Sequence, residues 1–224
     1  MTTAIETTED VKALSAFGLQ AQFEITEAGR YLLEAGALAP HGRSGAFNGG
    51  IRVPGEDKFV LGGKSGAIEV SLDGVHLAGE LTRGLKEIIA LYSAVFRERP
   101  DLNAIIHTHS PNLTAYAIAH KPFPLRYWSV AKRVGVREIP LGDWAPRYSA
   151  EPVLQSLRAH PKAPAVLLRN RGLFTWGGKG ILELAKQLAS IEEAAEITLK
   201  AEILGGSQEL PAGSIEDFAT KQQG

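Results

Sequence analysis

The sequence contains no cysteine, and this absence excludes two kinds of chemistry. No disulfide can form, and no thiolate can act as a nucleophile or metal ligand, so a bound metal would have to be held by His, Asp or Glu. A Gly-x-Ser-x-Gly motif, which carries the nucleophile of many hydrolases, is also absent. A Schiff-base lysine stays open as a covalent alternative, but no single lysine stands out.

Strong charge and long apolar runs are lacking too. The 24 Lys and Arg residues balance 25 Asp and Glu residues to a net charge of −1, which leaves no basic field for nucleic acid and no polybasic patch for a membrane. No apolar run is long enough to cross a bilayer. The first ten residues are polar and acidic, unlike a targeting peptide. We therefore expect neither nucleic acid nor membrane as a partner, and a cytoplasmic location.

The sequence does contain alternating strand and helix patterns. A hydrophobic content of 44% in 224 residues supports a sizeable core. Since no linker interrupts the pattern, we predict one α/β domain at residues 15–205. Residues 1–14 would be a tail and the start of the first helix, and residues 206–224 a polar tail. Strands are predicted at residues 51–53, 58–61, 67–72, 75–78, 103–109, 134–139, 164–168 and 173–176, and helices at residues 8–16, 25–34, 82–99, 111–120, 152–158 and 181–204.

The most informative local pattern is a pair of histidines, His107 and His109, at the end of an apolar strand. Alternate residues of a strand point to the same face, so both imidazoles share one side. Ser110 and Pro111 follow as the expected N-cap and first residue of a helix. A surface pair is the alternative, but the apolar residues before it favour a core strand, where two imidazoles form half of a zinc-like site.

Other candidates are weaker when judged from the residues alone. Glu87 on the preceding helix has the alternative of facing solvent, and Tyr127 that of lying in the core or an interface. The glycine-rich stretch around Asn48 could bind a phosphate or carboxylate through its N–H groups, but its spacing is that of neither a P-loop nor a dinucleotide motif. Ser65 and Gly66 form a similar weak candidate.

Residues 96–110, Phe-Arg-Glu-Arg-Pro-Asp-Leu-Asn-Ala-Ile-Ile-His-Thr-His-Ser, resemble the segment of the class II aldolase/adducin family that ends in its metal-binding His-x-His. The resemblance extends over about residues 15–205 and includes several shorter matches in order, namely Asn48 with Arg52, Ser65 with Gly66, Tyr127, residues 167–173 and the last helix. It implies a three-layer αβα fold with a central, mostly antiparallel sheet. It also implies a homotetramer of fuculose-phosphate-aldolase type with active sites at subunit interfaces.

The resemblance further implies a divalent cation, zinc first with manganese, iron or cobalt as alternatives. In the family this cation is held by a Glu, the His-x-His pair and a later histidine, and it stabilises an enediolate during C–C cleavage. The Glu doubles as acid/base, and a Tyr from the neighbouring subunit protonates the departing oxygen. Carried over to this chain, the expected metal ligands are His107, His109 and Glu87, the catalytic groups Glu87 and Tyr127, and the substrate-binding residues Asn48, Arg52, Ser65 and Gly66.

Two departures from the family pattern concern the metal ligands. Counting backward from His107 puts the Glu position on Ile88, whereas counting forward from the turn at residues 73–74 puts it on Glu87, so a one-residue shift is expected. The turn that should read Asn-His-Gly contains Arg171 in place of the histidine. A protonated arginine cannot be a ligand. Either the metal has a changed shell, or Arg171 replaces its charge and binds an anionic substrate directly. We therefore predict Arg171 as a catalytic residue together with Glu87 and Tyr127.

A third departure concerns the substrate, because Gly50 stands where the family pattern has a serine in the phosphate loop. A carboxylate substrate is therefore favoured over a sugar phosphate. The function predicted is a metal-dependent lyase, an aldolase or decarboxylase, acting on a small anionic hydroxy or keto compound. Two alternatives stay open, a non-catalytic adducin-like binding module and a non-heme iron oxygenase with a two-histidine-one-carboxylate site. Oxygen consumption and metal content would discriminate among the three.

Overall fold

The computed structural model describes residues 11–39, 47–64, 66–146 and 148–215. Within these ranges a central eight-stranded sheet has the order β4-β3-β2-β1-β5-β10-β9-β8, and neighbouring strands are antiparallel except for the parallel pair β8 and β9. The strands are β1 (Phe47–Arg52), β2 (Lys58–Gly63), β3 (Gly66–Ser71), β4 (His76–Ala78), β5 (Ala104–Thr108), β8 (Leu141–Gly142), β9 (Ala165–Leu168) and β10 (Leu173–Gly177). A second, small sheet pairs β6 (Phe123–Pro124) with β7 (Glu138–Ile139).

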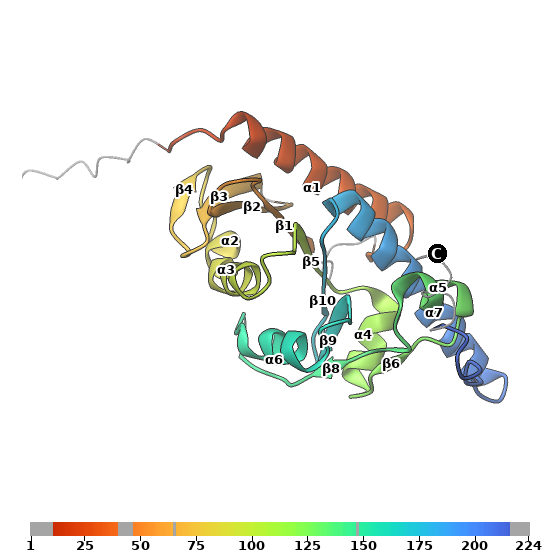
Figure 1. The fold of residues 1–224 in the computed structure, drawn as a ribbon. Helices are drawn as coiled ribbons and strands as arrows, with labels where there is room; N and C mark the ends of the chain where they lie inside the picture. The colour runs from red at the N-terminus through yellow and green to blue at the C-terminus, as the bar shows by residue number, and fades with distance from the viewer. Residues whose placement is uncertain (1–10, 40–46, 65, 147, 216–224) are drawn as a thin grey trace, which may run out of the picture.

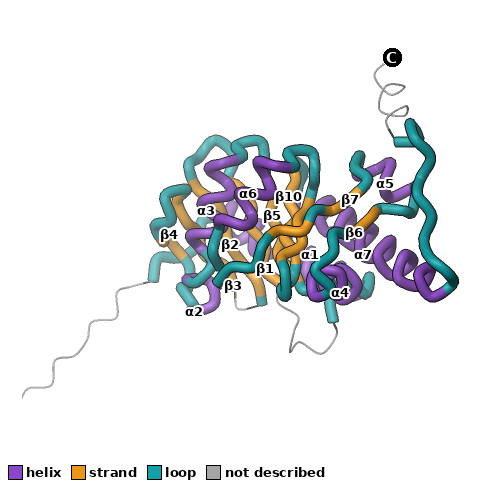
Figure 2. Tube along the Cα trace, turned by 90° about the horizontal axis from the view of Figure 1, so that it is seen from below, coloured by secondary structure: helices purple, strands orange, loops and turns teal. Residues whose placement is uncertain are grey.

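Helices cover both faces of the large sheet (Figures 1 and 2). They are α1 (Ala16–Glu34), α2 (Arg83–Lys86), α3 (Ile89–Glu98), α4 (Pro111–Ile118), α5 (Trp128–Val134), α6 (Glu151–Ala159) and α7 (Ile181–Ile203). In the described part of the chain, none of them is long and apolar enough to span a membrane. The predicted three-layer α/β fold with a mostly antiparallel central sheet is confirmed.

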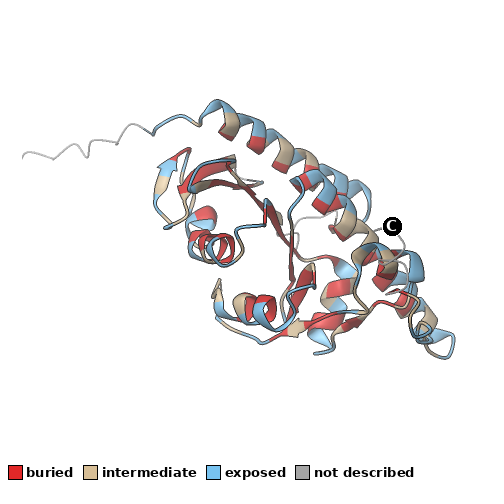
Figure 3. Cartoon of the chain, in the orientation of Figure 1, coloured by how far each residue is buried: buried red, intermediate tan, exposed pale blue. Residues whose placement is uncertain are grey.

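Two hydrophobic cores lie on opposite faces of the sheet. One is shared with α1, α4, α5 and α7, and the other with α3 and α6. Strand β5 contributes to both, because Ala104 and Ile106 face the first core and Ile105 faces the second. Figure 3 shows buried residues along the strands and on the sides of the helices that face them. Every residue of β5 is buried, so the histidine strand lies in the centre of the molecule.

Two glycines in β1 let the helices approach this centre from both sides. A Cβ atom on Gly49 would lie 2.5 Å from Cδ1 of Ile181 in α7, and one on Gly50 would lie 2.7 Å from Cδ1 of Tyr92 in α3. Both distances are far shorter than van der Waals contact. The glycine pair therefore allows the two helix layers to pack directly on β1.

The N-terminal helix differs from its prediction. In place of helices at residues 8–16 and 25–34, one continuous helix, α1, begins at Ala16, and residues 1–10 lie outside the described ranges. The hydroxyl of Ser15 caps α1 by accepting a hydrogen bond from Gly18 N at 3.0 Å. The buried face of α1 includes Ala21 and Ala28, and such small side chains give a weak hydrophobic signal in sequence.

Two other predicted elements are wrong in their boundaries. The strand predicted at residues 134–139 is reduced to β7, because α5 continues to Val134 and ends at Gly135, whose φ of +78° is left-handed. The helix predicted at residues 82–99 is broken into α2 and α3 at Glu87 and Ile88.

The described part of the predicted polar tail packs back onto the domain, as Figure 2 shows for the loop passing α5. Ile215 is only 6% exposed and joins the core shared by α1 and α7. The indole N–H of Trp128 donates to the carbonyl of Ser214 at 3.1 Å. Arg137 donates to the carbonyls of Leu210 and Pro211 at 3.2 and 3.1 Å. Residues up to 215 therefore form part of the folded structure.

The close packing on β1 predicts a stability difference between two glycine variants. Gly50→Ala should lower the free energy of unfolding by about 1–3 kcal/mol, because the added methyl group overpacks the contact with Tyr92. Gly84→Ala is the matched control: Gly84 lies on α2, is exposed, and a Cβ there meets nothing within 4 Å. It should be neutral or stabilising by up to about 1 kcal/mol. Urea unfolding measures both, and equal tolerance of the two substitutions would contradict the packing argument.

Candidate active site

The two histidines of the predicted pair lie together at one end of β5. His107 is only 3% exposed, and its ring stacks on Phe174 of β10 with 4.5 Å between ring centroids and an interplanar angle of 30°. The ring of His109, which follows the last residue of β5, stands edge-on to it at 5.2 Å and 86°. One imidazole is therefore fixed inside the core, while the other lies nearer the surface.

Sheet register brings several predicted site residues to this same end. Asn48 of β1 lies directly opposite His107, and Gly63 of β2 lies opposite Asn48. Gly66, the first residue of β3, pairs with Gly63 in turn. Ser65 lies outside the described residues. Asn48 and Gly66 thus lie at the same end of the strands as the histidines, which is where a substrate-binding role would require them.

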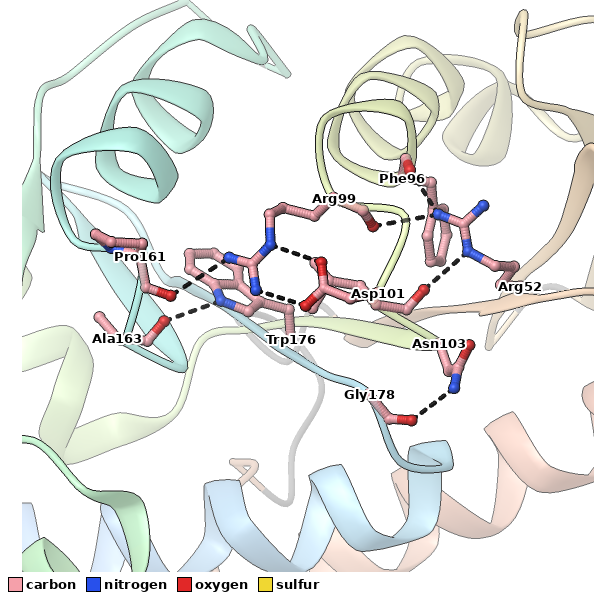
Figure 4. Close-up of polar contacts among 10 residues, drawn as sticks. Arg52, Phe96, Arg99, Asp101, Asn103, Pro161, Ala163, Trp176 and Gly178 are labelled. Atoms are coloured by element: carbon pink, nitrogen blue, oxygen red, sulfur yellow. Dashed lines mark hydrogen bonds and ion pairs between the residues drawn. The ribbon is translucent and has the colours of Figure 1, made fainter. Parts of the chain in front are cut away.

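Arg52, predicted to bind substrate, lies at the opposite end of β1. Its guanidinium donates to the carbonyls of Leu102, Phe96 and Arg99, at 2.9 Å for Leu102 and 3.3 Å for Arg99, and its Cζ lies 4.9 Å from the centre of the Phe96 ring. Figure 4 shows it tied to the loop between α3 and β5. The structure therefore does not bring Arg52 together with His107, and the contacts that it makes are those of a residue that fixes this loop.

Glu87 lies at the break between α2 and α3. Its side chain is 28% exposed and accepts a hydrogen bond from Nε of Arg83 at 3.1 Å. The neighbouring Ile88 is 2% exposed and belongs to the core shared with α3 and α6. The helix break at Glu87 and Ile88 is the kind of irregularity that a one-residue shift needs, and Ile88 belongs to the hydrophobic core.

Sequence reasoning assigned Tyr92 no functional position, yet it joins the strands beneath the site. The side chain is 1% exposed, and its hydroxyl donates to the carbonyl of Asn48 at 3.0 Å. Burial raises the pKa of Tyr92. Its helical spacing indicated only a core position, because a sequence pattern does not show which partner a buried hydroxyl finds.

Arg171 approaches the histidines from the turn between β9 and β10. Asn170 there has a left-handed φ of +55°. A Cβ on Gly172 would collide with the carbonyl of Thr108 and the ring of His109, so only glycine lets the turn pack against the pair. Arg171 is half-buried, and its Cζ lies 5.6 Å from the centre of the Tyr148 ring. Tyr148, which had no predicted role, has a φ of +64°, uncommon for an aromatic residue.

Burial controls the protonation of His107. Burial first, and then the charges of His109 and Arg171, lower the pKa of His107 to about 3. The imidazole is therefore neutral at neutral pH. Its Nε2 atom is buried and has no hydrogen-bond partner among the described residues. A neutral imidazole with an unpartnered nitrogen is the form that binds a metal ion.

The donor set therefore fits a divalent cation through two imidazoles. Within the described ranges, no group of three or more His, Asp or Glu side chains is arranged to hold a metal ion. His107 and His109 are the two predicted ligands that the structure brings together, and Arg171 brings a positive charge beside them. Two imidazoles beside a guanidinium can also hold an anion.

Tyr127, the predicted acid, lies immediately before α5 and is 42% exposed. Its neighbour Trp128 is 46% exposed. α5 packs on α7 in the layer that also contains α1 and α4. Tyr127 is therefore at the surface of its own chain.

The neutral state of His107 predicts a pH dependence of stability in the metal-free protein. The unfolded chain takes up a proton with a pKa of about 6.5, whereas folded His107 does so only near 3, so stability is complete above about pH 6.5 and is lost as the pH falls towards 3. This group contributes up to about 1.4 kcal/mol per pH unit. In urea unfolding with a chelator present, the stability advantage of wild type over His107→Gln should shrink between pH 6 and 4. A constant difference would show that His107 is not buried in the neutral form.

Residues 61–199 of the chain match the family described as the Class II Aldolase and Adducin N-terminal domain. The chain is 30% identical over 127 residues to 5-methylthioribulose-1-phosphate/5-deoxyribulose-1-phosphate aldolase of Rhodospirillum rubrum, spanning 57% of this chain and 57% of that protein. It is 28% identical over 207 residues to methylthioribulose-1-phosphate dehydratase of Hahella chejuensis, covering 85% of this chain and 95% of the relative. It is 29% identical over 160 residues to 3,4-dihydroxyphthalate decarboxylase of Arthrobacter keyseri, covering 66% and 63%.

The fold is also that of a solved L-fuculose 1-phosphate aldolase. The two structures superpose with a TM-score of 0.78 at 20% sequence identity, covering 95% of this chain and 99% of the other. The family match includes β5 with its histidine pair, the turn that carries Arg171 and most of α7. The chain belongs to the class II aldolase and adducin N-terminal domain family.

Proposed function

We propose that the protein is a metal-dependent lyase that cleaves a C–C bond in a small anionic hydroxy or keto compound, as an aldolase or decarboxylase. The observation that carries this proposal is the buried, unpartnered Nε2 of His107 beside the ring of His109, with Arg171 on the adjoining turn. Relatives named as an aldolase, a dehydratase and a decarboxylase support it. Cleavage of a C–C bond next to a carbonyl group leaves an enolate or enediolate, whose negative charge needs stabilisation.

His107 and His109 would hold the cation, with Glu87 as a third ligand from the break between α2 and α3. The absence of thiolates and the presence of imidazoles suit zinc, and also manganese, iron or cobalt. A divalent cation held there would polarise a substrate oxygen and stabilise the negative charge that develops on it. Glu87, whose side chain is 28% exposed at the helix break, would remove a proton from the substrate and return it.

The remaining residues would bind and orient the substrate. Asn48 and Gly66 lie at the same end of the strands as His107, and Ser65 is the neighbour of Gly66 in sequence. In a homotetramer with active sites at the subunit interfaces, the partner subunit's Tyr127 would protonate the departing oxygen. The exposed position of this tyrosine supports such an arrangement, because a residue that serves another subunit must reach out from its own.

Arg171 would bind the anionic group of the substrate directly. Its guanidinium is planar and matches a carboxylate with two parallel hydrogen bonds. The ring of Tyr148 lies 5.6 Å from its Cζ and limits its orientations. Since Gly50 provides no hydroxyl for a phosphate, a carboxylate is the favoured anionic group.

Metal content tests the first part of this proposal. Purified protein reconstituted with zinc or cobalt should hold one ion per chain by elemental analysis, and His107→Ala should weaken binding at least tenfold in equilibrium dialysis. Arg171→His should tighten binding at least tenfold, because it removes a positive charge and adds an imidazole. Wild type without metal after reconstitution would refute the metal-lyase function and favour a non-catalytic binding module.

Reaction products test the second part. Metal-loaded protein incubated with a panel of small hydroxy and keto acids should release a carbonyl product or CO₂ without consuming oxygen, whereas oxygen uptake would favour an iron oxygenase. Arg171→Met should raise KM for the active acid at least tenfold while changing kcat less, because it removes a binding contact. An unchanged KM would show that Arg171 does not bind the substrate.

A further inference from the structure

We infer that Glu192 of α7 is a positioning residue for His109, acting through the start of α4. The residue touches neither histidine, and sequence reasoning gave it no role. It matters because the backbone that carries His109 leads directly into α4, and the first turn of this helix is fastened to α7 by one carboxylate.

The contacts of Glu192 are short and numerous. The side chain is 3% exposed. Its Oε1 accepts from the backbone N–H of Asn112 at 2.6 Å and from the side-chain amide of Asn112 at 2.9 Å, and its Oε2 accepts from the backbone N–H of Leu113 at 3.0 Å. These are the second and third residues of α4, whose N–H groups have no partner within the helix. The carboxylate also lies at the positive end of the helix dipole.

This arrangement replaces the local cap that the sequence predicts. Ser110 occupies the N-cap position of α4, yet its side chain makes no capping hydrogen bond. Its hydroxyl is instead hydrogen-bonded to that of Thr108 at 2.8 Å, and both residues are fully buried. Because Glu192 accepts hydrogen bonds from the first N–H groups of α4, the Ser110 hydroxyl can pair with that of Thr108. These two residues lie on either side of His109 in the chain.

A cap from Ser110 would have fixed α4 only to its own loop. The cap from Glu192 fixes that loop to α7. This helix packs on the sheet and contacts β5 directly. On the other side, the turn at Gly172 contacts the ring of His109. His109 is thus held between two restraints, and loss of the Glu192 contacts would leave only one of them.

Glu69 provides a matched control in the same protein. It is 4% exposed and also lies at a helix start, accepting from the backbone N–H of Ser15 at 2.7 Å just before α1. Its second oxygen is paired with Lys58 at 3.2 Å. Glu69 is on β3, which is separated from β5 by β2 and β1. A substitution there removes a buried carboxylate without touching the histidine loop.

The test compares Glu192→Gln with Glu69→Gln in the metal-free protein. Each substitution replaces one acceptor oxygen by an amide and should lower the melting temperature by a similar amount. Histidine ring signals in ¹H–¹⁵N NMR spectra of this six-histidine chain give a readout that stability alone does not move. We expect Glu192→Gln to shift or split the His109 signals and Glu69→Gln to leave them unchanged. Wild-type His109 signals in both variants would overturn the inference.

Cobalt affinity is a second readout, and this part rests on the proposed function. Glu192→Gln should weaken cobalt binding at least fivefold and alter the visible spectrum of bound cobalt, whereas Glu69→Gln should do neither. Absence of cobalt binding in wild type would refute the proposed metal function, while the ring spectra would still decide the role of Glu192. Should Glu192→Gln fail to fold, Asn112→Ala removes one of the three hydrogen bonds and should cause a smaller shift of the same His109 signals; an unchanged spectrum there would equally overturn the inference.

Discussion

Packing of helices onto both faces of β1 and β5 is the constraint on which the histidine site depends. Gly49 and Gly50 leave room for α7 and α3, and the closeness of α3 lets the Tyr92 hydroxyl reach the backbone carbonyl of Asn48 in β1. His107 is buried because the helices packed on this face of the sheet cover it. Burial makes its imidazole neutral and leaves Nε2 without a partner, so the chemistry of the site follows from packing and not from an exposed cluster of polar groups.

Much of this arrangement could be predicted from the sequence, for a physical reason. A buried strand followed by Ser-Pro has a strong local signature, and alternation along the strand fixes that both histidines share a face. The order of strands and helices, combined with the family resemblance, gave the three-layer fold. These features depend on residues close together in sequence or on a pattern shared by the whole family.

The features that sequence did not predict depend on contacts between distant segments. Ser110 had the sequence signature of an N-cap, but the carboxylate of Glu192, 82 positions away, caps α4 in the structure. No local sequence pattern reveals this long-range cap. Arg52 matched the family pattern of a substrate ligand. In the structure, however, its guanidinium donates hydrogen bonds to carbonyls of the loop before β5. The break between α2 and α3 at Glu87 and Ile88 was not predicted either, because the apolar spacing continues through it.

Arg171 and a metal ion held by the histidines would repel each other unless an anion lay between them. Unit charges 4 Å apart interact by about 4 kcal/mol at the effective dielectric of a protein surface, and a doubly charged cation doubles this repulsion. A carboxylate that bridges the cation and the guanidinium turns the repulsion into attraction on both sides. His107, His109 and Glu87 would hold the cation before substrate binds, and the bridging carboxylate would tighten both contacts. In this way a positive residue beside the imidazoles makes metal binding and recognition of an anionic substrate one coupled event.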